Sequence, residues 1–467
     1  MKVVIAGAGD MGNFIARYLL AEEHDIVVID TDAARVRDMT DNESVAGFLG
    51  ETTSLDVLKA VDMSNTDMFV SVTPNDEINI LACFLADSLG VPTKIARIQN
   101  PNYLQENFLD LFHSNKIPVS DTISVVDKML DVLQKEIDYS YFKISDIVNL
   151  CEGNIMFFSV YCDPNSVAHN RSIESLYQDL EEQHITFKVA GIYRNNNFNI
   201  VNDEEIIRQK DKLYIVADSK NIEAVYALFY NIGESEDIVL DTQQTNIVIA
   251  GDHSFIKQIA VELAQTYKKV KVVMNKEKSE VTLLAIELEK YNIELIIDDI
   301  TKTGYREHYL SSPNDVIITM YKNDNDNVLQ ALLLQSQKFN NIFCCLNSNL
   351  YVDFLYSHKI NRVFIPDHFI MSSILANIRR GIIQNIFSLY NKVEIMEVST
   401  SSNSNLIGKR IEDLELGGKM KILSLMDEST GHKIPLDPNT IIQSNNNVVF
   451  IIQRKHIKTL EDNVKYE

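Results

Sequence analysis

Two distant stretches of the sequence have the same frame: a short apolar run, then Ala-Gly, then a helical apolar rhythm. The first reads "KVVIAGAGDMGNFIARYLL" at residues 2–20, and the second reads "IVIAGDHSFIKQIAVELA" at residues 247–264. Gly7 in the first matches Gly251 in the second, an offset of 244 residues. A turn of this kind joins a β-strand to a helix, so we expect the chain to contain one α/β unit twice.

The repeat continues beyond this turn. The stretch "NDEINILACFLADSLG" at 75–90 matches "NDNDNVLQALLLQSQK" at 323–338, and Tyr103 matches Tyr351, both at an offset of 248. Later in each half, "IVNDEEIIRQKDKLYIV" (200–216) and "PLDPNTIIQSNNNVVFII" (435–452) share a polar turn, Ile-Ile, a second polar turn and an apolar strand. Several landmarks in one order predict a tandem repeat in which each large domain is followed by a smaller lobe.

Short β-rich apolar runs alternate with helical stretches in the first half. The runs lie at 3–6, 26–29, 45–49, 68–72 and 94–98, and the helical stretches include 11–21 and 78–89. This alternation predicts βαβ units and a parallel sheet. The expected fold class is therefore α/β, with two Rossmann-like parallel-sheet domains, each followed by a small α+β lobe. The expected segments are 1–140, 141–232, 244–389 and 390–467.

The first copy has a complete glycine motif. Gly7-Ala8-Gly9-Asp10-Met11-Gly12 fits the pattern GxGxxG and lies directly between a strand and a helix. Gly7 permits the tight turn, Gly9 lets the backbone approach a pyrophosphate, and Gly12 lets the helix and the strand pack closely. The amide groups and the dipole of the helix start favour the phosphate charge. We predict a nucleotide-binding site at this turn.

Asp30 closes the second strand, "DIVVID", 18 residues after Gly12, where a carboxylate binds a ribose diol. A 2′-phosphate beside Asp30 would meet a like charge, which costs about 1–4 kcal/mol at a separation of about 4 Å. Asp32 adds to this repulsion, and Arg35 and Arg37 offset part of it. NAD or NADH is therefore favoured over the phosphorylated dinucleotides. ATP and ADP carry the same diol and stay open as ligands.

Other residues at the carboxyl ends of strands border the same crevice. They are Gly50 and Glu51, then Thr73, Pro74 and Asp76 in "TPNDE", and Arg97 in "KIARI". Arg97 stands among apolar neighbours, where an unpaired guanidinium is costly. A ligand phosphate and an internal ion pair are equally good explanations for it.

The second copy has lost the same features. Gly9 is replaced by His253 and Gly12 by Ile256, and the ribose-binding acid becomes Asn275. Gly50-Glu51 becomes Asp298-Asp299, which adds negative charge where a phosphate would approach. We predict that this half no longer binds a dinucleotide and is retained for packing and assembly.

The composition limits the partners. The formal net charge is −23 and the pI is near 4.9, so the surface repels nucleic acid and anionic lipid at neutral pH. No apolar stretch approaches the roughly 18–20 residues that span a bilayer. We expect a cytoplasmic chain without direct membrane insertion. An integral membrane protein as a partner is compatible with these features.

The sequence offers little for catalysis. Its five cysteines form no CxxC pair, which argues against a disulfide framework or a zinc ribbon and favours reduced core residues. The ten histidines are scattered, with no HxxxH or HxxE pair, and no GxSxG motif is present. We predict no catalytic residue, no metal ligand and no enzyme activity. The alternative is an NAD-dependent oxidoreductase that uses the first lobe to bind substrate.

The arrangement resembles the TrkA family, the peripheral subunits of Trk-type potassium uptake, which contain tandem RCK (KTN) domains. The residues that carry the match are "KVVIAGAGDMG", Asp30 in "VVIDTD", "VSVTPNDEINILAC", "PTKIARIQNPNY" and, in the second half, "ILANIRRG". The likeness covers nearly the whole chain. It is specific over the first 105 residues and looser over 245–365, where many family members keep a second glycine motif.

The resemblance implies a cytoplasmic regulatory subunit at the inner face of the cell membrane. It implies a homo-oligomeric ring and an integral membrane, potassium-translocating Trk subunit as the partner, and it makes the small lobes RCK C-terminal lobes. Gly7 through Gly12, Asp30, Thr73-Pro74 and Arg97 would hold NAD or NADH, with ATP or ADP as competitors. A gating subunit for a different cation channel or antiporter is the alternative within this class.

The stretch "TISVVDKMLDVLQKEI" at 122–137 predicts an amphipathic helix directly after the first sheet. Its apolar stripe contains Ile123, Val126, Leu130, Leu133 and Ile137. Packing on its own domain is one explanation of this stripe. In RCK proteins the matching segment helps to pair neighbouring domains, and the resemblance favours an association role.

Overall fold

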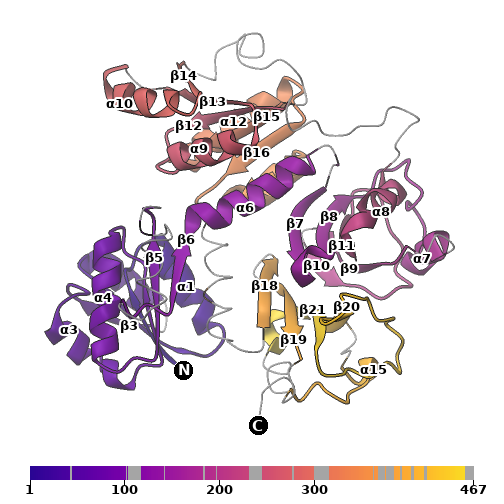
Figure 1. Ribbon diagram of the computed structural model, residues 1–467, viewed down its shortest axis with the longest axis horizontal. Helices are drawn as coiled ribbons and strands as arrows, with labels where there is room; N and C mark the ends of the chain where they lie inside the picture. The colour runs from indigo at the N-terminus through magenta and orange to yellow at the C-terminus, as the bar shows by residue number, and fades with distance from the viewer. Residues whose placement is uncertain are drawn as a thin grey trace. The chain divides into compact units, whose positions relative to one another are not determined.

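The computed structural model describes residues 1–42, 45–100, 103, 117–140, 142, 144–181, 185–195, 197–230, 245–275, 278–298, 315–360, 362–366, 374, 383–389, 392–400, 404–414 and 418–457. Two compact units can be distinguished in it. One is built on Met1–Lys128, and the other is built mainly on Met129–Ile365 and Ile378–Glu467. Figure 1 labels their helices and strands.

The first unit contains a six-stranded parallel sheet in the order β3-β2-β1-β4-β5-β6. Its strands are β1 (Lys2–Ala6), β2 (Asp25–Asp30), β3 (Ala46–Leu49), β4 (Met68–Ser71), β5 (Thr93–Ile98) and β6 (Asp121–Ser124). Its helices include α1 (Asp10–Leu20), α2 (Ala33–Asn42), α3 (Leu55–Ala60) and α4 (Asp76–Ser88). Right-handed crossovers place α1 and α2 on one face and α3 and α4 on the other. Strand order reverses between β1 and β4, which creates a crevice at the carboxyl ends of these strands.

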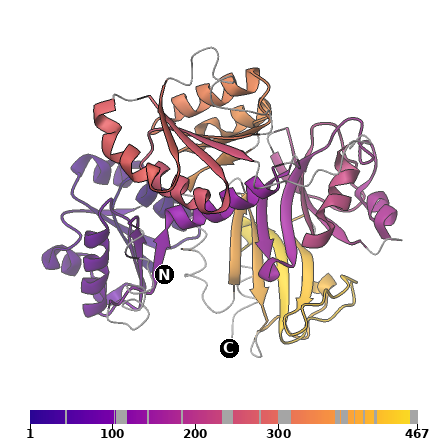
Figure 2. The ribbon, with the colours of Figure 1, turned by 45° about the horizontal axis from the view of Figure 1, so that its top comes forward.

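The second unit contains a parallel sheet of the same topology, in the order β14-β13-β12-β15-β16-β17. Figure 2 shows helices on both sides of this sheet. Its strands are β12 (Asn246–Gly251), β13 (Lys269–Met274), β14 (Glu294–Ile297), β15 (Val316–Met320), β16 (Asn341–Cys345) and β17 (Arg362–Phe364). Its helices include α9 (Ile256–Thr266), α10 (Lys278–Glu289), α12 (Asp324–Ser336) and α13 (Val352–Ser357). The central strands are apolar and buried on both faces, as a parallel sheet covered by two helical layers requires.

Two antiparallel sheets complete the second unit, in the orders β10-β9-β11-β8-β7 and β18-β19-β21-β20. The first consists of β7 (Ile144–Leu150), β8 (Ile155–Tyr161), β9 (Phe187–Arg194), β10 (Asn197–Ile200) and β11 (Lys212–Asp218), with α7 (Ile173–Glu181) and α8 (Ile222–Phe229). The second consists of β18 (Ile383–Leu389), β19 (Val393–Ser399), β20 (Met420–Asp427) and β21 (Asn446–Gln453), with α15 (Ile411–Leu414). These are the two small lobes, and the predicted fold class is confirmed.

The two lobes share details that only a repeat explains. Ile206 forms an isolated antiparallel bridge in the first lobe, and Ile441 forms one in the second. Their side chains are 50% and 51% exposed, whereas the next residues, Ile207 and Ile442, are fully buried. The Ile-Ile pairs that match in the sequence therefore occupy the same position in both lobes, and the predicted tandem repeat is confirmed.

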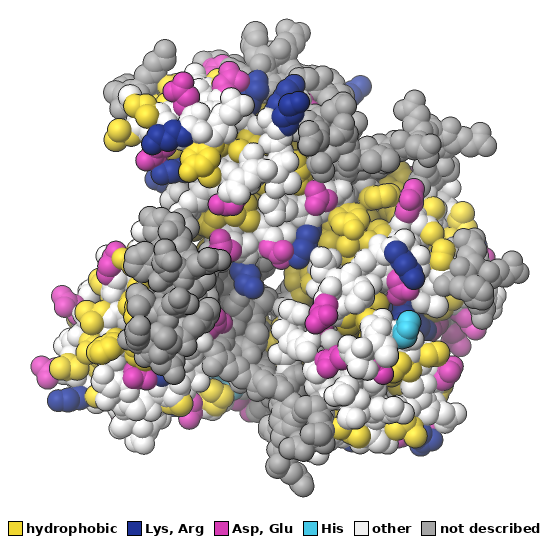
Figure 3. Space-filling model, viewed as in Figure 1, with side chains coloured by type: hydrophobic (Ala, Val, Ile, Leu, Met, Phe, Trp, Pro, Cys, Tyr) yellow, Lys and Arg dark blue, Asp and Glu magenta, His cyan; other side chains and the backbone are white. Residues whose placement is uncertain are grey.

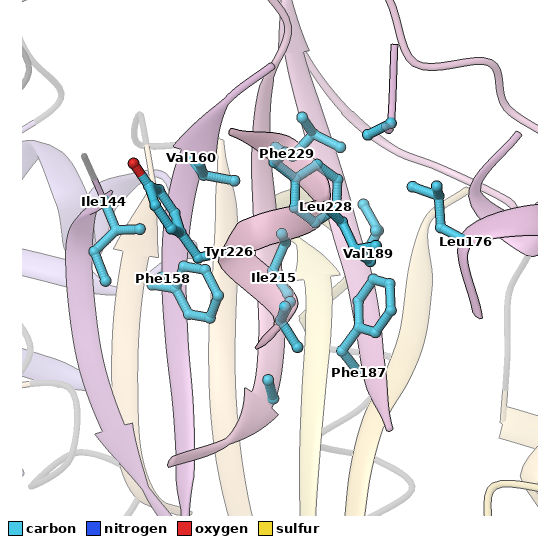
Figure 4. Packing of buried hydrophobic residues seen from close by; sticks show 14 of the residues in the cluster. Ile144, Phe158, Val160, Leu176, Phe187, Val189, Ile215, Tyr226, Leu228 and Phe229 are labelled. Carbon is cyan, nitrogen blue, oxygen red and sulfur yellow. The ribbon is translucent and has the colours of Figure 1, made fainter. Parts of the chain in front are cut away.

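Each lobe has an apolar interior, and the two interiors meet. Figure 4 shows the core of the first lobe, where residues of α8 such as Phe229 pack against strand residues such as Ile215. On the other face of this sheet, Phe157 and Tyr214 share one core with Ile395 and other residues of the second lobe. The lobes thus bury a continuous hydrophobic layer between their sheets.

Helix α6 begins later than the apolar stripe predicts. The first sheet extends to Ser124, and α6 covers Val125–Asp138, so residues 122–124 lie in β6 and not in the helix. The side chain of Ile123 lies outside the described part, whereas Val126, Leu130, Leu133 and Ile137 are buried. The β-rich run "TISVV" satisfies both a strand and a helix start, and pairing with β5 decides for the strand.

The four segment boundaries stay a prediction. The strand β18, which precedes the expected limit at 389, pairs with β19 in the sheet of the second lobe. A limit just before Ile383 would keep this sheet in one segment, because β7 holds the equivalent position at the start of the first lobe.

All five cysteines are buried thiols, as expected for core residues. Within the described ranges, no helix is long and apolar enough to cross a membrane. On the face shown in Figure 3, acidic and basic side chains are interspersed over the described residues.

Candidate functional site

The glycine turn of the first half lies between β1 and α1, at the point where the strand order reverses. Gly7 has a φ of +109°, a conformation that favours glycine. A Cβ on Gly12 would lie 1.8 Å from the carbonyl oxygen of Gly7, so only glycine lets α1 pack this close to the turn. A Cβ on Gly9 would meet its nearest neighbour at 3.9 Å. The fold therefore requires Gly7 and Gly12, whereas Gly9 leaves space above the turn.

The amino end of α1 has the features of an anion site. Gly9 is the N-cap residue and has no side chain to satisfy the first amide groups of the helix. By contrast, α4 is capped by the side chain of Asn75 and α12 by that of Asn323. The residues beside Gly9 differ in solvent exposure: Asp10 is exposed, whereas Ala8 and Met11 are buried. Amide groups left open at a helix start bind phosphate well.

Asp30 holds the turn from the neighbouring strand. Its Oδ2 accepts a 2.6 Å hydrogen bond from the backbone amide of Ala8, and its Oδ1 accepts a 2.8 Å bond from the amide of Asp32. The side chain is buried, with 9% exposure. A carboxylate has about four acceptor positions, so these two bonds leave capacity for a ribose diol.

The other predicted residues gather at the carboxyl ends of neighbouring strands. The amide of Gly50 donates to the carbonyl of Asp30, and the side chain of Glu51 is exposed beside it. Pro74 is exposed after β4, and Arg97 is half-buried on β5. The structure thus brings the segments containing these residues to the same edge of the sheet as the glycine turn.

The carboxylate of Asp76 does not face the crevice as an exposed group would. Its carboxylate is buried and accepts bonds from the amides of Gln99 and Asn100, at 2.7–3.0 Å. Asp324 accepts bonds from the amides of Asn347 and Ser348 in the second half. We interpret Asp76 as a residue that orders the loop after β5, because the same bonds are present in the half that has lost its glycines.

Asn79 lies beside the glycine turn, although the glycine motif does not mark it. It is fully buried, and its Oδ1 accepts bonds from the amide and the hydroxyl of Thr73, at 3.0 and 2.7 Å. Its Nδ2 donates to the carbonyl oxygens of Thr73 and Arg97. One amide side chain therefore fixes the ends of both β4 and β5 beside the glycine turn. The available signal was the shared "NDxxN" pattern, which puts Asn327 at the matching position.

The second half retains one glycine for structural reasons. Gly251 has a φ of +146°, and a Cβ there would lie 2.0 Å from the carbonyl oxygen of Met320. The amide of His253 donates to that same oxygen at 3.0 Å. Because the end of β15 lies so close to Gly251, only glycine fits there. This explains why the glycine persists although the rest of the motif is lost.

The replaced glycines change where the second helix begins. The residue matching Asp10 is Ser254, yet α9 begins two positions later, at Ile256, which is 1% exposed. A late start gives Ile256 room in the core, so the bulky residue does not crowd the strand as it would at Gly12. The prediction that Asn275 replaces Asp30 is wrong by one residue: in the sheet register the buried Met274 matches Asp30, and the exposed Asn275 follows it. Asp298 is described, and Asp299 lies outside the described residues.

The described residues around the glycine turn show no cluster suited to catalysis. No group of three or more His, Cys, Asp or Glu side chains able to hold a metal occurs in the described part of the chain. Burial raises the pKa of the Cys344 thiol to about 12 and raises that of Cys83 further, which keeps both thiols protonated. His24 lies near Glu22, at 3.6 Å, outside the glycine turn, and His308 lies outside the described residues. The arrangement is suited to binding an anion and a diol.

These features define a tandem α/β protein with one open, dinucleotide-type glycine turn and two paired antiparallel lobes. The TrkA-N domain model matches residues 3–116, and the TrkA-C domain model matches residues 395–465. The chain is 26% identical over 472 residues to the Trk system potassium uptake protein TrkA of Vibrio alginolyticus, covering 99% of this chain and 98% of that protein. It is 26% identical over 466 residues to TrkA of Azorhizobium caulinodans, with the same coverage. The resemblance to the TrkA family is confirmed over the whole chain.

Solved structures agree on the fold. The crystal structure of the GsuK RCK domain aligns with 99% of this chain and 94% of its own chain, at a TM-score of 0.57 and 14% identity. The GsuK channel bound to NAD aligns with 99% of this chain and 78% of its own, at a TM-score of 0.56 and 14% identity. The tandem RCK architecture is therefore the fold of this chain.

Proposed function

We propose that this chain is a cytoplasmic regulatory subunit that binds NAD or NADH in its first half and gates a potassium-translocating membrane protein of the Trk type. It acts as a homo-oligomeric ring at the inner face of the cell membrane. The observation that carries the proposal is the open glycine turn at the switch point of the first sheet, held by Asp30 through the 2.6 Å bond to the amide of Ala8. The full-length similarity to TrkA proteins supports the transport role.

The ligand class follows from the groups around the turn. The amino end of α1 attracts a diphosphate, and Asp30 accepts hydrogen bonds from a ribose diol. Asp30 and Asp32 repel a 2′-phosphate, which favours NAD and NADH over their phosphorylated forms. ADP and ATP present the same diol and diphosphate, so they compete for the site. One similar structure is that of a channel bound to NAD, which is compatible with this ligand class.

Gating requires that the ligand bind two states of the ring with different affinities. NAD and NADH differ in the charge and planarity of the nicotinamide, so a crevice that contacts this ring can distinguish them. The second half, without its glycines, serves packing and assembly. The ring thus has one responsive site per chain.

Two other functions make different predictions. An oxidoreductase would need an acid or base near the substrate, and steady consumption of NADH with a carbonyl substrate would support it. A gating subunit for a different cation channel or antiporter would bind the same nucleotides, because the ion never contacts this chain. Only the identity of the membrane partner would distinguish such a subunit from a regulator of Trk-type uptake.

The test combines binding and transport. Calorimetric titration of the purified chain with NAD, NADH, ADP and ATP should give micromolar-range binding at one equivalent per chain. A Trk-type membrane protein from the same cell should co-purify with the chain, and potassium flux into vesicles holding both should change between NAD and NADH. Binding of two equivalents would contradict the single-site proposal. Flux that is indifferent to the chain and its nucleotide would contradict the gating role.

A further inference from the structure

The side chain of Arg35 reaches the glycine turn from α2. Arg35 is exposed, and its Nη1 lies 3.9 Å from the position of a Cβ on Gly9. It is the nearest neighbour of that position. Its Nε lies 3.7 Å from Oδ2 of Asp32, so the guanidinium is held between this carboxylate and the turn. Nη1 therefore faces the space that the missing side chain of Gly9 leaves open.

That space is where the proposed ligand carries its strongest charge. In a glycine turn of this type, the second glycine lets the backbone approach the pyrophosphate. A guanidinium beside it can bind phosphate oxygens through two parallel N–H groups, which a lysine ammonium cannot match. Arg35 would thus complete the anion site that the amides at the start of α1 form.

The neighbouring arginine provides a contrast. Arg37 is also exposed on α2, but two positions along a helix correspond to a rotation of about 200°. It therefore lies on a different face of α2 from Arg35. The sequence alone assigns the same screening role to both arginines, whereas the structure places Arg35 at the turn.

The second half provides an internal comparison. In the sheet register Asp30 matches Met274, and the same offset of 244 matches Arg35 to Ser279. The chain therefore has arginine where the second glycine is present and an uncharged serine where that glycine has become His253. Loss of the glycine and loss of the positive charge occur together, as expected if both serve one phosphate group.

We propose that Arg35 binds the diphosphate of the nucleotide and is a determinant of affinity for it. This inference rests on the proposed function, because it assigns a role within the same site. It predicts that the diphosphate is recognised from two sides, by the amides of α1 and by the guanidinium of Arg35. The 2′-position of the ribose is left to Asp30 and Asp32.

The test compares Arg35→Gln, Arg35→Lys and Arg37→Gln in the full-length chain. Affinities for NAD, NADP and ADP are measured by calorimetry, and the affinity for adenosine is measured by displacement of fluorescent NADH. Arg35→Gln should weaken NAD and ADP binding about tenfold, the effect of one charge-assisted hydrogen bond, and should leave adenosine binding unchanged. Arg35→Lys should restore part of the affinity, and Arg37→Gln should match the wild type.

Salt dependence is an additional measurement. The ratio of wild-type to Arg35→Gln affinity for ADP should fall as salt is raised from about 0.05 to 0.5 M, because an exposed contact with phosphate is screened. A purely structural role of Arg35 would not produce this dependence, and the thermal midpoint of Arg35→Gln should equal that of the wild type.

The outcomes separate the two proposals. Equal affinities of the wild type and Arg35→Gln for NAD and ADP would overturn the role of Arg35 and leave the nucleotide site intact. If Arg35→Gln also loses affinity for adenosine, the substitution damages the site as a whole. If it loses affinity for NADP only, the guanidinium lies at the 2′-phosphate. Either result overturns the assignment of Arg35 to the diphosphate. A wild-type chain that binds none of these ligands would overturn the proposed function together with this inference.

Discussion

Arg362 and Glu136 form a buried ion pair between β17 and α6, with 3.3 Å between Nε of the arginine and Oε2 of the glutamate. The same guanidinium donates to the carbonyl oxygens of Ser140 and Phe142, at 3.1 and 3.0 Å, where α6 ends. The other oxygen of Glu136 accepts the amide of Ile147 in β7, at 3.2 Å. This pair therefore joins the second parallel sheet, the end of α6 and the first lobe at one point.

Arg362→Met should destabilise the second unit strongly. At pH 8, where Glu136 is ionised, the substitution leaves its carboxylate buried without a counter-ion and removes donors from the carbonyls at the end of α6, which costs about 3–5 kcal/mol. Unfolding in urea, followed by circular dichroism, measures the change. Arg410→Met is the matched control, because Arg410 pairs with Glu412 on the surface and such pairs contribute at most about 1 kcal/mol. If both variants lost the same free energy of unfolding, the buried pair would contribute no more to stability than the surface pair.

Glu136 should also make the first lobe sensitive to pH. Burial raises the pKa of Glu136 from 4.5 to about 7, and the charge of Arg362 opposes this only in part. The folded chain thus holds a proton that the unfolded chain releases near pH 4.5. The resulting stability is present below pH 4.5 and is lost as the pH rises through about 7, to a total of about 3 kcal/mol.

Glu136→Gln removes this titration and keeps an acceptor for the amide of Ile147. Hydrogen exchange of the β7 segment at pH 5, 6, 7 and 8, corrected for intrinsic rates, gives the opening free energy at each pH. The wild-type value minus the variant value should fall between pH 5 and 7 and level off above. A difference that is constant over this range would show that Glu136 does not titrate there.

The glycine turn allows binding and folding to be separated. A Cβ on Gly9 fits the protein, because its nearest neighbour is 3.9 Å away, but it occupies the path of the pyrophosphate. Gly9→Ala should therefore reduce nucleotide affinity at least about tenfold at an unchanged thermal midpoint. Gly12→Ala places a Cβ 1.8 Å from a backbone oxygen and should cost about 3 kcal/mol of stability. Normal affinity in Gly9→Ala would contradict binding at this turn.

The main features of the fold were predictable because they rest on periodic patterns. The glycine frames and the Ile206 and Ile441 pairs repeat in one order, and repeats of this kind specify both parallel sheets and both lobes. Local ambiguity explains the errors. The run "TISVV" suits a strand as well as a helix. The match of Asp30 to Asn275 is wrong by one residue, because only the pairing of the strands fixes their register.

The candidate site was predictable only where a motif marks it. Residues 7–12 and Asp30 lie at fixed spacings along the chain, and the structure brings them together by the 2.6 Å bond from Ala8. Asn79 and Arg35 could not be assigned in this way. Their roles depend on which strand ends and helix faces become neighbours, and this is decided by the order of strands in the sheet. The Arg362–Glu136 pair joins residues 226 positions apart and has no local signal.

Asn79 and Asn327 form a matched pair for mutation. Each clamps the loop after the fourth strand of its sheet: Asn79 binds Thr73, and Asn327 binds both backbone groups of Tyr321, at 2.7 and 2.8 Å. Replacement by alanine leaves buried donors without acceptors, so each variant should lose about 2–3 kcal/mol of stability. Only Asn79→Ala should also lose nucleotide affinity, by about tenfold at a temperature where both variants are folded. If Asn79→Ala and Asn327→Ala bind the nucleotide with equal affinity, Asn79 does not contribute to the nucleotide site.

Restoring glycines to the second half should not restore a nucleotide site. The variant His253→Gly with Ile256→Gly recovers the letters of the motif. However, α9 begins at residue 256 in the wild type, and Met274 stands in place of the carboxylate that holds the turn in the first half. Removal of Ile256 also empties a buried position, which lowers stability by about 2–5 kcal/mol. Calorimetry should give one equivalent of NAD per chain for the wild type and for this variant, and the affinity of that one equivalent should fall at least about tenfold when Gly9→Ala is added. A second equivalent in the glycine variant would mean that side-chain bulk alone closes the second site.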